Sequence, residues 1–482
     1  MDTRTAYPLG AIAGAALCIA VTSTWAQVVP TPPQHYEPHV QRIDGDPGAK
    51  GAAVSEVIQI EDAAWVRLDF GDYHLGDKST VTIRSLADED AQTLDTRAMV
   101  WWSGTSAFFN GDAVAISLDV ADGDEGVFVE VEGIVVGEYM PGDEKPAPGQ
   151  KTLCGADSRV ASTDARVGRT NMGGCTAWLT SNGSVLTAGH CLDGTRPPDG
   201  TPDLTGSIQF NPPASLANGT TQAATAANQY PINNATRVGA FDGDNNLGDD
   251  WGVFGLNPNN TNGDRAHLTR GFFRMTRENP SAGNTIRITG YGVDDTPAGS
   301  GGGPCCRRNS SGVCTSTNCN AQNMTEQTST GSYVDQQGTS GRFFHRYATD
   351  TEPANSGSPI IWNTNGYTIG IHTNGGCNSD GSGANQGTSF EHNPLEVAIR
   401  DFPGTNTEYV DFLTPPTNPT EDGSVFRPWD TVTEGVAGVA SGRNLAIVEG
   451  SYTAANGNTF TAGADGKAFT IIAPVGSVTI GN

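Results

Sequence analysis

Residues 175–191 read CTAWLTSNGSVLTAGHC, and this stretch decides the fold that we expect. Two short apolar segments flank Asn182-Gly183, a dipeptide typical of the tight turn of a β-hairpin. Cys175 and Cys191 stand at the two ends of the stretch, so a disulfide can close the hairpin. Such a bridge would fix the loop that presents His190. A lone histidine is usually structural or solvated, but a histidine in this frame is a specific signal.

A second motif lies further along the chain, where residues 248–254 read GDDWGVF. An acid that enters a buried strand needs a partner, because an unpaired buried carboxylate is costly. Asp250 is better placed for this than Asp249, since the apolar run follows it directly. Both acids could instead simply end the acidic loop that starts at Asp242.

A third motif, ANSGSPI at residues 354–360, is centred on Ser356. Most serines are surface or capping residues, but this one lies in a tight turn. Its own N–H group and that of Ala354 could therefore face an oxyanion. Peptide hydrolysis needs a nucleophile, a base, a group that orients the base, and donors for the developing oxyanion. The three motifs supply these parts in the chain order His190, Asp250, Ser356.

These motifs resemble those of the chymotrypsin-like serine proteases, whose triad has the same order. Subtilisins and α/β-hydrolases place the three residues in other orders. The resemblance implies an all-β fold with a chymotrypsin-like double β-barrel. It also implies that His190 is the general base, Asp250 the acid that orients it, and Ser356 the nucleophile. The N–H groups of Ala354 and Ser356 would then form the oxyanion hole.

A closer resemblance, to the bacterial glutamyl endopeptidases (V8-like), covers about residues 165–404. It is visible in NSGSP at 355–359 and GIHTNGG at 370–376, with a closing NQGT at 385–388.

In that group, the residues that match His372 and Thr351 line the primary pocket and hydrogen-bond a glutamate side chain. An imidazole and a hydroxyl can donate to a carboxylate without adding a fixed counter-charge. The resemblance therefore implies cleavage of polypeptide substrates after Glu or Asp.

Asp350 supports a competing interpretation, because it stands where trypsin carries its selectivity acid. A free carboxylate at the floor of the pocket would favour Arg or Lys. Glutamyl endopeptidases can also carry an acid there, followed by the same threonine, so position alone does not decide between the two. The histidine and threonine of the pocket favour acidic substrates.

A third interpretation is a catalytically weak protease scaffold that serves for binding. Its only support is Ala354, which stands where the family normally has glycine. If the backbone needs a positive φ there, alanine is strained and the oxyanion hole is imperfectly formed. Asn355 also departs from trypsin-like enzymes, which pair an aspartate at this position with a newly freed N-terminus.

The start of the chain indicates export. Arg4, the apolar run 9–21 and Thr24-Trp25-Ala26 predict a signal peptide over residues 1–26, and its apolar run is too short to span a bilayer comfortably. We therefore expect an extracellular protein with no membrane contact after this segment is removed. The formal net charge of −26 argues against nucleic-acid partners and for a soluble surface.

Cysteine usage agrees with export, because removal of Cys18 leaves an even number of the nine cysteines. Cys175 and Cys191 are expected to pair, and Cys154 and Cys377 are the pair left over. The remaining four are expected to form local bridges: Cys305, Cys306, Cys314 and Cys319. Two adjacent cysteines do not fit the usual spacing of zinc ligands. The loop from Asp242 lacks the glycine and glutamate of an EF-hand, so no metal or cofactor is predicted.

Composition and strand-like alternation divide the chain into segments. Residues 51–138 predict a small β-sandwich that could be a pro-domain, a substrate-recruiting domain or a spacer. Cleavage between Lys151 and Arg169 would release the catalytic unit from such a zymogen. The β-rich tail resembles the start of a β-solenoid and could attach the enzyme to a surface. The expected segments are a linker at 27–50, the sandwich at 51–138, a linker at 139–154, the protease domain at 155–404, a linker at 405–425, and the tail at 426–482.

Overall fold

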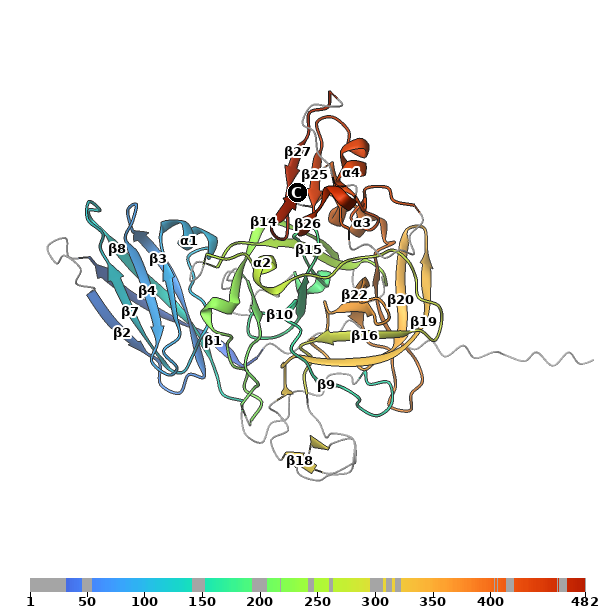
Figure 1. The fold of residues 1–482 in the computed structure, drawn as a ribbon. Coiled ribbons are helices and arrows are strands. Elements are labelled where there is room, and N and C mark those ends of the chain that lie inside the picture. Colours follow the sequence, from blue (N-terminus) through green and yellow to red (C-terminus); the bar gives the residue numbers. More distant parts are fainter. Residues whose placement is uncertain are drawn as a thin grey trace, which may run out of the picture.

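In the computed structural model of the 482-residue chain, the regular secondary structure is almost all strand, with a few short helices (Figure 1). The all-β class expected from the sequence is thus confirmed. The predicted signal peptide lies outside the described residues. These residues are 32–45, 54–140, 152–192, 206–216, 218–241, 247–259, 263–294, 307–308, 314–316, 322–402, 404, 406–412, 420–456, 458 and 466–481.

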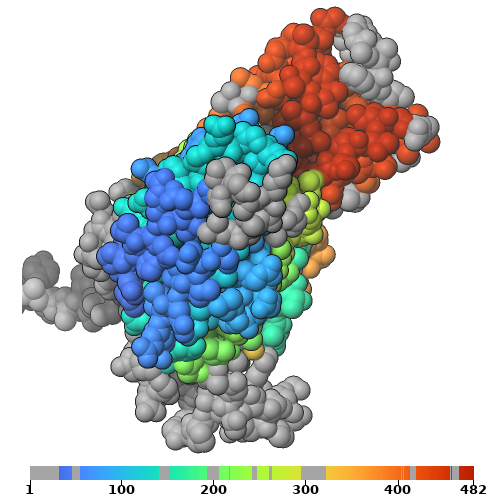
Figure 2. Space-filling model, turned by 90° about the vertical axis from the view of Figure 1, so that its left-hand side faces the viewer, coloured from blue at the N-terminus to red at the C-terminus, as the bar shows by residue number. Residues whose placement is uncertain are grey.

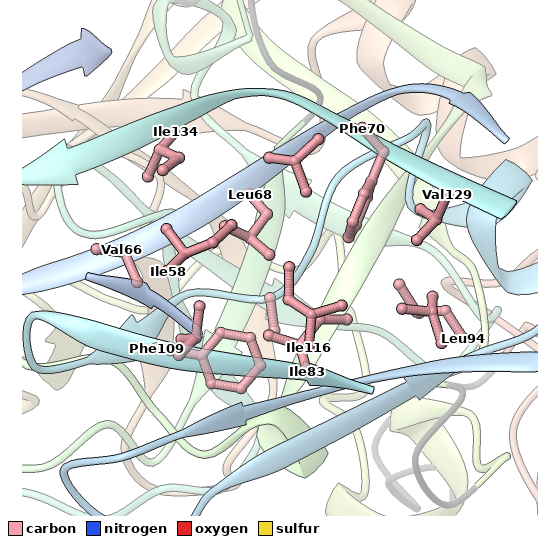
Figure 3. Packing of buried hydrophobic residues seen from close by; sticks show 14 of the residues in the cluster. Ile58, Val66, Leu68, Phe70, Ile83, Leu94, Phe109, Ile116, Val129 and Ile134 are labelled. Atoms are coloured by element: carbon pink, nitrogen blue, oxygen red, sulfur yellow. The ribbon is translucent and has the colours of Figure 1, made fainter. Parts of the chain in front are cut away.

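The N-terminal part is a sandwich of two four-stranded antiparallel sheets. The first sheet has the order β1 (Gln34–Asp44), β8 (Phe128–Gly137), β3 (Trp65–His74) and β6 (Phe109–Asn110). The second has the order β2 (Val54–Gln59), β7 (Ala113–Asp119), β4 (Thr80–Ser85) and β5 (Ala91–Leu94). Alternate residues of both sheets, such as Leu68 and Ile116, point inward and form one apolar core (Figure 3).

Two of the predicted linkers are partly strands. β1 lies in the expected linker 27–50, but it pairs with β8 along the edge of the first sheet. Pro38 contributed to the incorrect prediction of a linker. Proline is also compatible with an edge strand, and the pairing register of β1 shifts just after this residue. Likewise, β24 (Thr407–Val410) lies in the expected linker 405–425 and pairs with β25 (Asn444–Ile447) of the tail.

The central part of the chain contains two barrels. The strands of the first form a closed barrel in the order β10 (Val167–Thr170), β11 (Thr176–Leu179), β12 (Val185–Thr187), β15 (Asp250–Leu256), β14 (Gln229–Phe241) and β13 (Ser207–Phe210). The second has the order β16 (Thr285–Gly290), β21 (Pro359–Trp362), β22 (Thr368–Asn374), β23 (Asn385–Ser389), β20 (Arg342–Ala348) and β19 (Gln327–Thr339). Pairing of β16 with β19 closes it, and β9 (Val160–Ala161) extends β19. This confirms the expected double β-barrel.

The hairpin within residues 175–191 forms β11 and β12 of the first barrel. Trp178 pairs with Leu186, and all residues of both strands are buried, which explains their continuous apolar character. In the turn, Asn182 Oδ1 accepts a hydrogen bond from the backbone N–H of Ser184 at 3.0 Å. The turn asparagine therefore shapes the loop through its side chain.

The C-terminal tail is a short coil of parallel strands, as the solenoid-like pattern predicted. β24, β25 and β27 (Thr470–Ile472) form one parallel sheet, and β26 (Gly450–Tyr452) pairs in parallel with β28 (Val478–Ile480). The coil is not isolated, because Val448 and Val475 are buried in the apolar core of the first barrel. An ion pair of 2.5 Å between Arg274 Nε and Asp411 Oδ2 adds a second connection.

The three parts of the chain occupy different sides of the molecule. The sandwich covers the face shown in Figure 2, and the C-terminal coil extends from one end of that face. The helices are short: α1 (Thr96–Trp101), α2 (Ala266–Arg270), α3 (Asn393–Arg400) and α4 (Val432–Gly438). None of the helices among the described residues has the length and apolar character needed to cross a bilayer.

Candidate active site

His190 and Asp250 meet in the first barrel. His190 lies in the 3₁₀ turn η1 (Gly189–Cys191), and Asp250 begins β15. The Nδ1 atom of His190 is 2.7 Å from Asp250 Oδ2, and the backbone N–H of His190 donates to Oδ1 at 3.0 Å. Both carboxylate oxygens therefore fix the histidine. A Cβ atom at Gly189 would lie 1.9 Å from the Ala240 carbonyl oxygen, which explains the glycine before His190.

Asp249, the alternative acid, faces other residues. One of its carboxylate oxygens lies 3.0 Å from His392 Nε2, and the other lies 3.2 Å from Arg342 Nη2. Burial lowers the pKa of His392. Asp249 thus holds the chain just before Asp250, whereas Asp250 contacts His190.

Ser356 lies in a turn that only a following glycine allows. Gly357 has a φ of 91°, and a Cβ atom there would lie 2.0 Å from the Thr176 carbonyl oxygen. Its N–H donates to the His372 carbonyl at 2.8 Å. Ser356 Oγ and His190 Nε2 are both buried, and neither forms a hydrogen bond within the described part of the chain. Neither atom is therefore committed to a structural contact.

Ala354 adopts the positive φ that strains the backbone of an alanine. Its φ is 76°, in the left-handed region, which costs a residue with a Cβ atom roughly 1–2 kcal/mol. Thr176 Oγ1 donates to its carbonyl oxygen at 3.0 Å, and the N–H of the next residue, Asn355, donates to the Glu352 carbonyl at 3.0 Å. Asn355 itself is buried and donates from Nδ2 to the same Glu352 carbonyl at 3.2 Å. The peptide unit that follows Ala354 is thus held at both its carbonyl and its N–H group.

Two predicted disulfides are present. Cys175 is bonded to Cys191 across the hairpin, and Cys154 is bonded to Cys377. The second bridge ties the chain just before the first barrel to the segment that follows β22. The other expected bridges, among Cys305, Cys306, Cys314 and Cys319, fall on residues whose side chains are not described.

His372 lies beside the nucleophile turn, on β22. Its backbone N–H donates to the Ser358 carbonyl at 2.8 Å, and its Nδ1 atom is 2.6 Å from the hydroxyl of Tyr347. Burial lowers the pKa of His372 to about 3, so the imidazole is neutral at neutral pH. The Tyr347 hydroxyl also reaches the Gln386 carbonyl at 3.0 Å.

Thr351 is buried in a network that joins the start and the end of this part of the chain. Its Oγ1 atom accepts a hydrogen bond from Asn385 Nδ2 at 2.9 Å and lies 3.0 Å from Thr152 Oγ1. Thr152 Oγ1 also donates to the Thr351 carbonyl at 2.6 Å. Since β23 begins at Asn385 and pairs with β22 next to His372, this strand connects the surroundings of Thr351 and His372.

Asp350 forms its hydrogen bonds with a different segment of the chain. Its Oδ1 atom accepts from the backbone N–H of Cys154, and its Oδ2 atom accepts from the N–H of Ser158, each at 2.7 Å. The hydroxyl of Ser158 donates to Oδ2 as well. Both carboxylate oxygens are therefore engaged with the segment that enters the first barrel.

Sequence reasoning missed Tyr347 and Thr152 as neighbours of the candidate pocket. Nothing in the local sequence distinguishes Tyr347 from any other aromatic strand residue. Asn385 belongs to a motif that the resemblance identified, but its contacts with Thr351 could not be inferred from it. These contacts depend on the pairing of strands that are distant in the sequence.

Comparison with known proteins gives the class of the two-barrel part. The family model described as Trypsin matches residues 154–390. This part of the chain is a trypsin-like serine protease domain. The match covers the elements that carry His190, Asp250 and Ser356 in the protease domain. A search of curated proteins found no match.

Solved structures similar to the chain include several bacterial proteases. A Glu endopeptidase in complex with MPD is 20% identical over 52% of this chain and 97% of its own, with a TM-score of 0.34. The thermostable serine protease AL20, from an extremophilic microorganism, is 16% identical over 48% of this chain and 96% of its own, with a TM-score of 0.32. The protease Anisep from Arthrobacter nicotinovorans is 14% identical over 48% and 93%, also with a TM-score of 0.32.

Proposed function

We propose that this serine endopeptidase is secreted and cleaves polypeptides after Glu or Asp, with His190, Asp250 and Ser356 as its catalytic triad. The observation that carries the triad is the double contact of His190 with Asp250, through Nδ1 and through the backbone. It holds the imidazole in one orientation, as a general base requires. Ser356, whose buried Oγ atom forms no hydrogen bond within the described part of the chain, is the corresponding nucleophile.

The proposed mechanism is acyl transfer. His190 Nε2 takes the proton from Ser356 Oγ as this oxygen attacks the scissile carbonyl carbon. Asp250 accepts a hydrogen bond from His190 Nδ1–H and stabilises the imidazolium that forms. The N–H groups of Ala354 and Ser356 donate to the oxyanion. His190 then protonates the leaving amine, and a water molecule hydrolyses the acyl-enzyme by the same route.

Two features support a preference for acidic side chains. His372 is neutral and adjoins the nucleophile turn. In the tautomer in which Nδ1 accepts from the Tyr347 hydroxyl, Nε2 carries the ring proton and can donate it to a substrate carboxylate. With the hydroxyl of Thr351, His372 forms the proposed pocket. Asp350, the residue that would instead attract Arg or Lys, accepts hydrogen bonds with both carboxylate oxygens from Cys154 and Ser158. Its negative charge is thereby stabilised by donors of this protein, which lessens its need for a cationic substrate side chain.

The specificity is tested with matched peptides that differ only at P1: Glu, Gln, Asp, Arg and Phe. We expect the Glu peptide to be cleaved fastest, and Gln, its neutral isostere, to be cleaved much more slowly. Ser356→Ala should lower turnover by about 10⁴-fold or more. Preference for Arg would assign the pocket to Asp350 and overturn the proposal.

The strained Ala354 favours a second candidate, a catalytically weak protease scaffold that serves for binding. An active-serine fluorophosphonate separates the two candidates. Labelling that disappears in Ser356→Ala indicates a working triad. Failure of the wild-type protein to react, while it is folded and processed, would favour the binding scaffold.

Secretion and processing are also part of the proposal. Two disulfides in the protease domain are typical of proteins that mature in an oxidising compartment. Residues 1–26 are the proposed signal peptide, and cleavage between Lys151 and Arg169 the proposed activation step. Mass spectrometry of the exported protein tests both, because it gives the N-terminal residue of each fragment directly.

A further inference from the structure

We propose that the sandwich, residues 32–140, remains bound to the protease domain after the chain is cut between them. It would then be a permanent part of the enzyme and not a removable inhibitory segment. The proposal rests on the contacts between the two parts and does not depend on the proposed specificity.

Two side-chain amides join the sandwich to the protease domain, one contributed by each part, and both form the same pattern of hydrogen bonds. Gln229 of the protease domain accepts from the N–H of Phe108 at 2.9 Å and donates to the Phe108 carbonyl at 2.8 Å. Asn110 of the sandwich accepts from the N–H of Ala223 at 2.7 Å and donates to the Ala223 carbonyl at 3.1 Å. Each amide thus bonds to both the N–H and the carbonyl of one residue, as a residue of a neighbouring strand would. The distance and direction of both contacts are therefore fixed.

Apolar side chains from both parts pack together beside these amides. Trp65 and Phe108 of the sandwich form one buried cluster with Met172 and Ala223 of the protease domain. The rings of Trp65 and Phe108 are 5.3 Å apart and meet edge to face. Separation would expose both aromatic rings to water, and the cost grows with the apolar area exposed.

The protease domain also contributes to the interior of the sandwich. Ala226, which begins the 3₁₀ turn η2 (Ala226–Asn228), is buried within the apolar core of the sandwich. Its N–H donates to Asp90 Oδ2 at 2.7 Å, and burial raises the pKa of Asp90. On the same side, Asn257 Nδ2 donates to the Trp101 carbonyl at 3.2 Å. The interface thus continues into the core of the sandwich.

These contacts do not involve the active site. Among the described residues, those of the protease domain that bond or pack against the sandwich lie near Met172, in 218–229 and at Asn257. None of them belongs to the triad or to the proposed pocket. A sandwich that binds at these residues does not contact the catalytic residues, so its presence is compatible with activity.

The test uses the full chain with a recognition sequence for a specific protease placed within residues 141–150. A cut there precedes Cys154, so the disulfide to Cys377 does not join the two fragments. Ser356→Ala in one preparation prevents self-digestion. Size-exclusion chromatography with light scattering at low protein concentration gives the mass under native conditions, and a denaturing gel shows that the cut is complete.

We expect both fragments to elute together at the mass of the uncut chain. In the preparation with Ser356 intact, kcat/KM should change less than twofold on cutting. Elution of two separate fragments would overturn the proposal, and so would a large rise in kcat/KM that accompanies release of the sandwich.

A double variant, Asn110→Ala with Gln229→Ala, tests the two amides. Its fragments should separate after cutting. Those of a matched control, Asn279→Ala with Gln337→Ala, should stay together, because these two amides are exposed and take no part in the contacts with the sandwich described above. Circular dichroism of the uncut variants shows whether each is folded. Joint elution of the fragments of a folded double variant would overturn the role assigned to the amides. If the double variant does not fold, the cut chain with native amides still decides the proposal.

Discussion

Thr176 Oγ1 donates a hydrogen bond of 3.0 Å to the carbonyl oxygen of Ala354, in the turn that carries the proposed oxyanion hole. The backbone N–H of Thr176 also donates to the Ser356 carbonyl at 2.8 Å. Strand β11 therefore holds the peptide units that follow Ala354 and Ser356, the two residues that carry the proposed donors. Variants of Ala354 and Thr176 therefore test the conformation of this turn and the hydrogen bonds that hold it.

Ala354→Gly should retain the turn, because glycine adopts a φ of 76° without steric cost. Relief of strain outweighs the extra flexibility of glycine in the unfolded chain, so the free energy of unfolding should rise by up to about 1 kcal/mol. We expect kcat/KM to be unchanged or higher. Urea denaturation and peptide hydrolysis measure the two quantities. A glycine variant with a lower free energy of unfolding would contradict the view that alanine is strained here, and a folded variant with much lower kcat would contradict the expected activity.

Thr176→Val should reduce kcat about tenfold and leave KM nearly unchanged. Valine has the shape of threonine but cannot donate to the Ala354 carbonyl, and it cannot accept from the N–H of Tyr291, which bonds to Thr176 Oγ1 at 3.0 Å. Thr176 would act as a positioning residue through the oxyanion donors. Thr176→Ser, which keeps the hydroxyl, should restore kcat. Equal losses in both variants would mean that packing of the methyl group matters instead.

Tyr347→Phe should raise KM for a peptide with Glu at P1 about tenfold, with a smaller effect on a peptide with Phe at P1. The variant removes the hydroxyl that lies 2.6 Å from His372 Nδ1, so the imidazole loses the group that orients it. Tyr333→Phe is the matched control, because Tyr333 forms the same kind of contact, at 3.1 Å, with His345 in the same barrel. The same change in KM in both variants would contradict a specific role for Tyr347.

Glu326→Gln should stabilise the protein above neutral pH. Burial raises the pKa of Glu326 from 4.5 to about 7. In the folded state Glu326 keeps its proton at pH values where the unfolded chain has lost it. The stability it contributes is therefore complete below pH 4.5 and is lost as pH rises toward 7.

The glutamine variant should lack this loss and be more stable above pH 7 by about 3 kcal/mol. An amide fits the site, because Tyr291 can accept from it and donate to the Val167 carbonyl instead. Thermal unfolding of both proteins as a function of pH measures the difference. Parallel stability curves would show that Glu326 does not titrate in this range.

Sequence reasoning succeeded where the structure depends on contiguous residues. The hairpin from Cys175 to Cys191 has its turn signal, its strands and its disulfide within one short stretch. Gly357 is required by the geometry of its own turn. The two-barrel fold follows from such motifs through the family resemblance, although the catalytic roles of His190, Asp250 and Ser356 stay a proposal.

The failures share a physical reason, since they concern contacts between distant parts of the chain. The partners of Asp350 lie 196 and 192 residues away, at Cys154 and Ser158, so its environment could not be read from neighbouring residues. β1 was missed because the composition around Pro38 resembles a linker. Its strand character depends on pairing with β8, near the far end of the sandwich.

The burial of Val475 within the first barrel has a consequence for the biosynthesis of the protein. The same apolar core contains Leu179 and Val185, which flank the hairpin that presents His190. While the chain is being synthesised, this core stays incomplete until residue 475 has been made. A nascent chain that already contains all three proposed catalytic residues would therefore still lack part of the barrel that positions them. Order of synthesis would thus delay proteolytic activity until Val475 has been made and has left the ribosome.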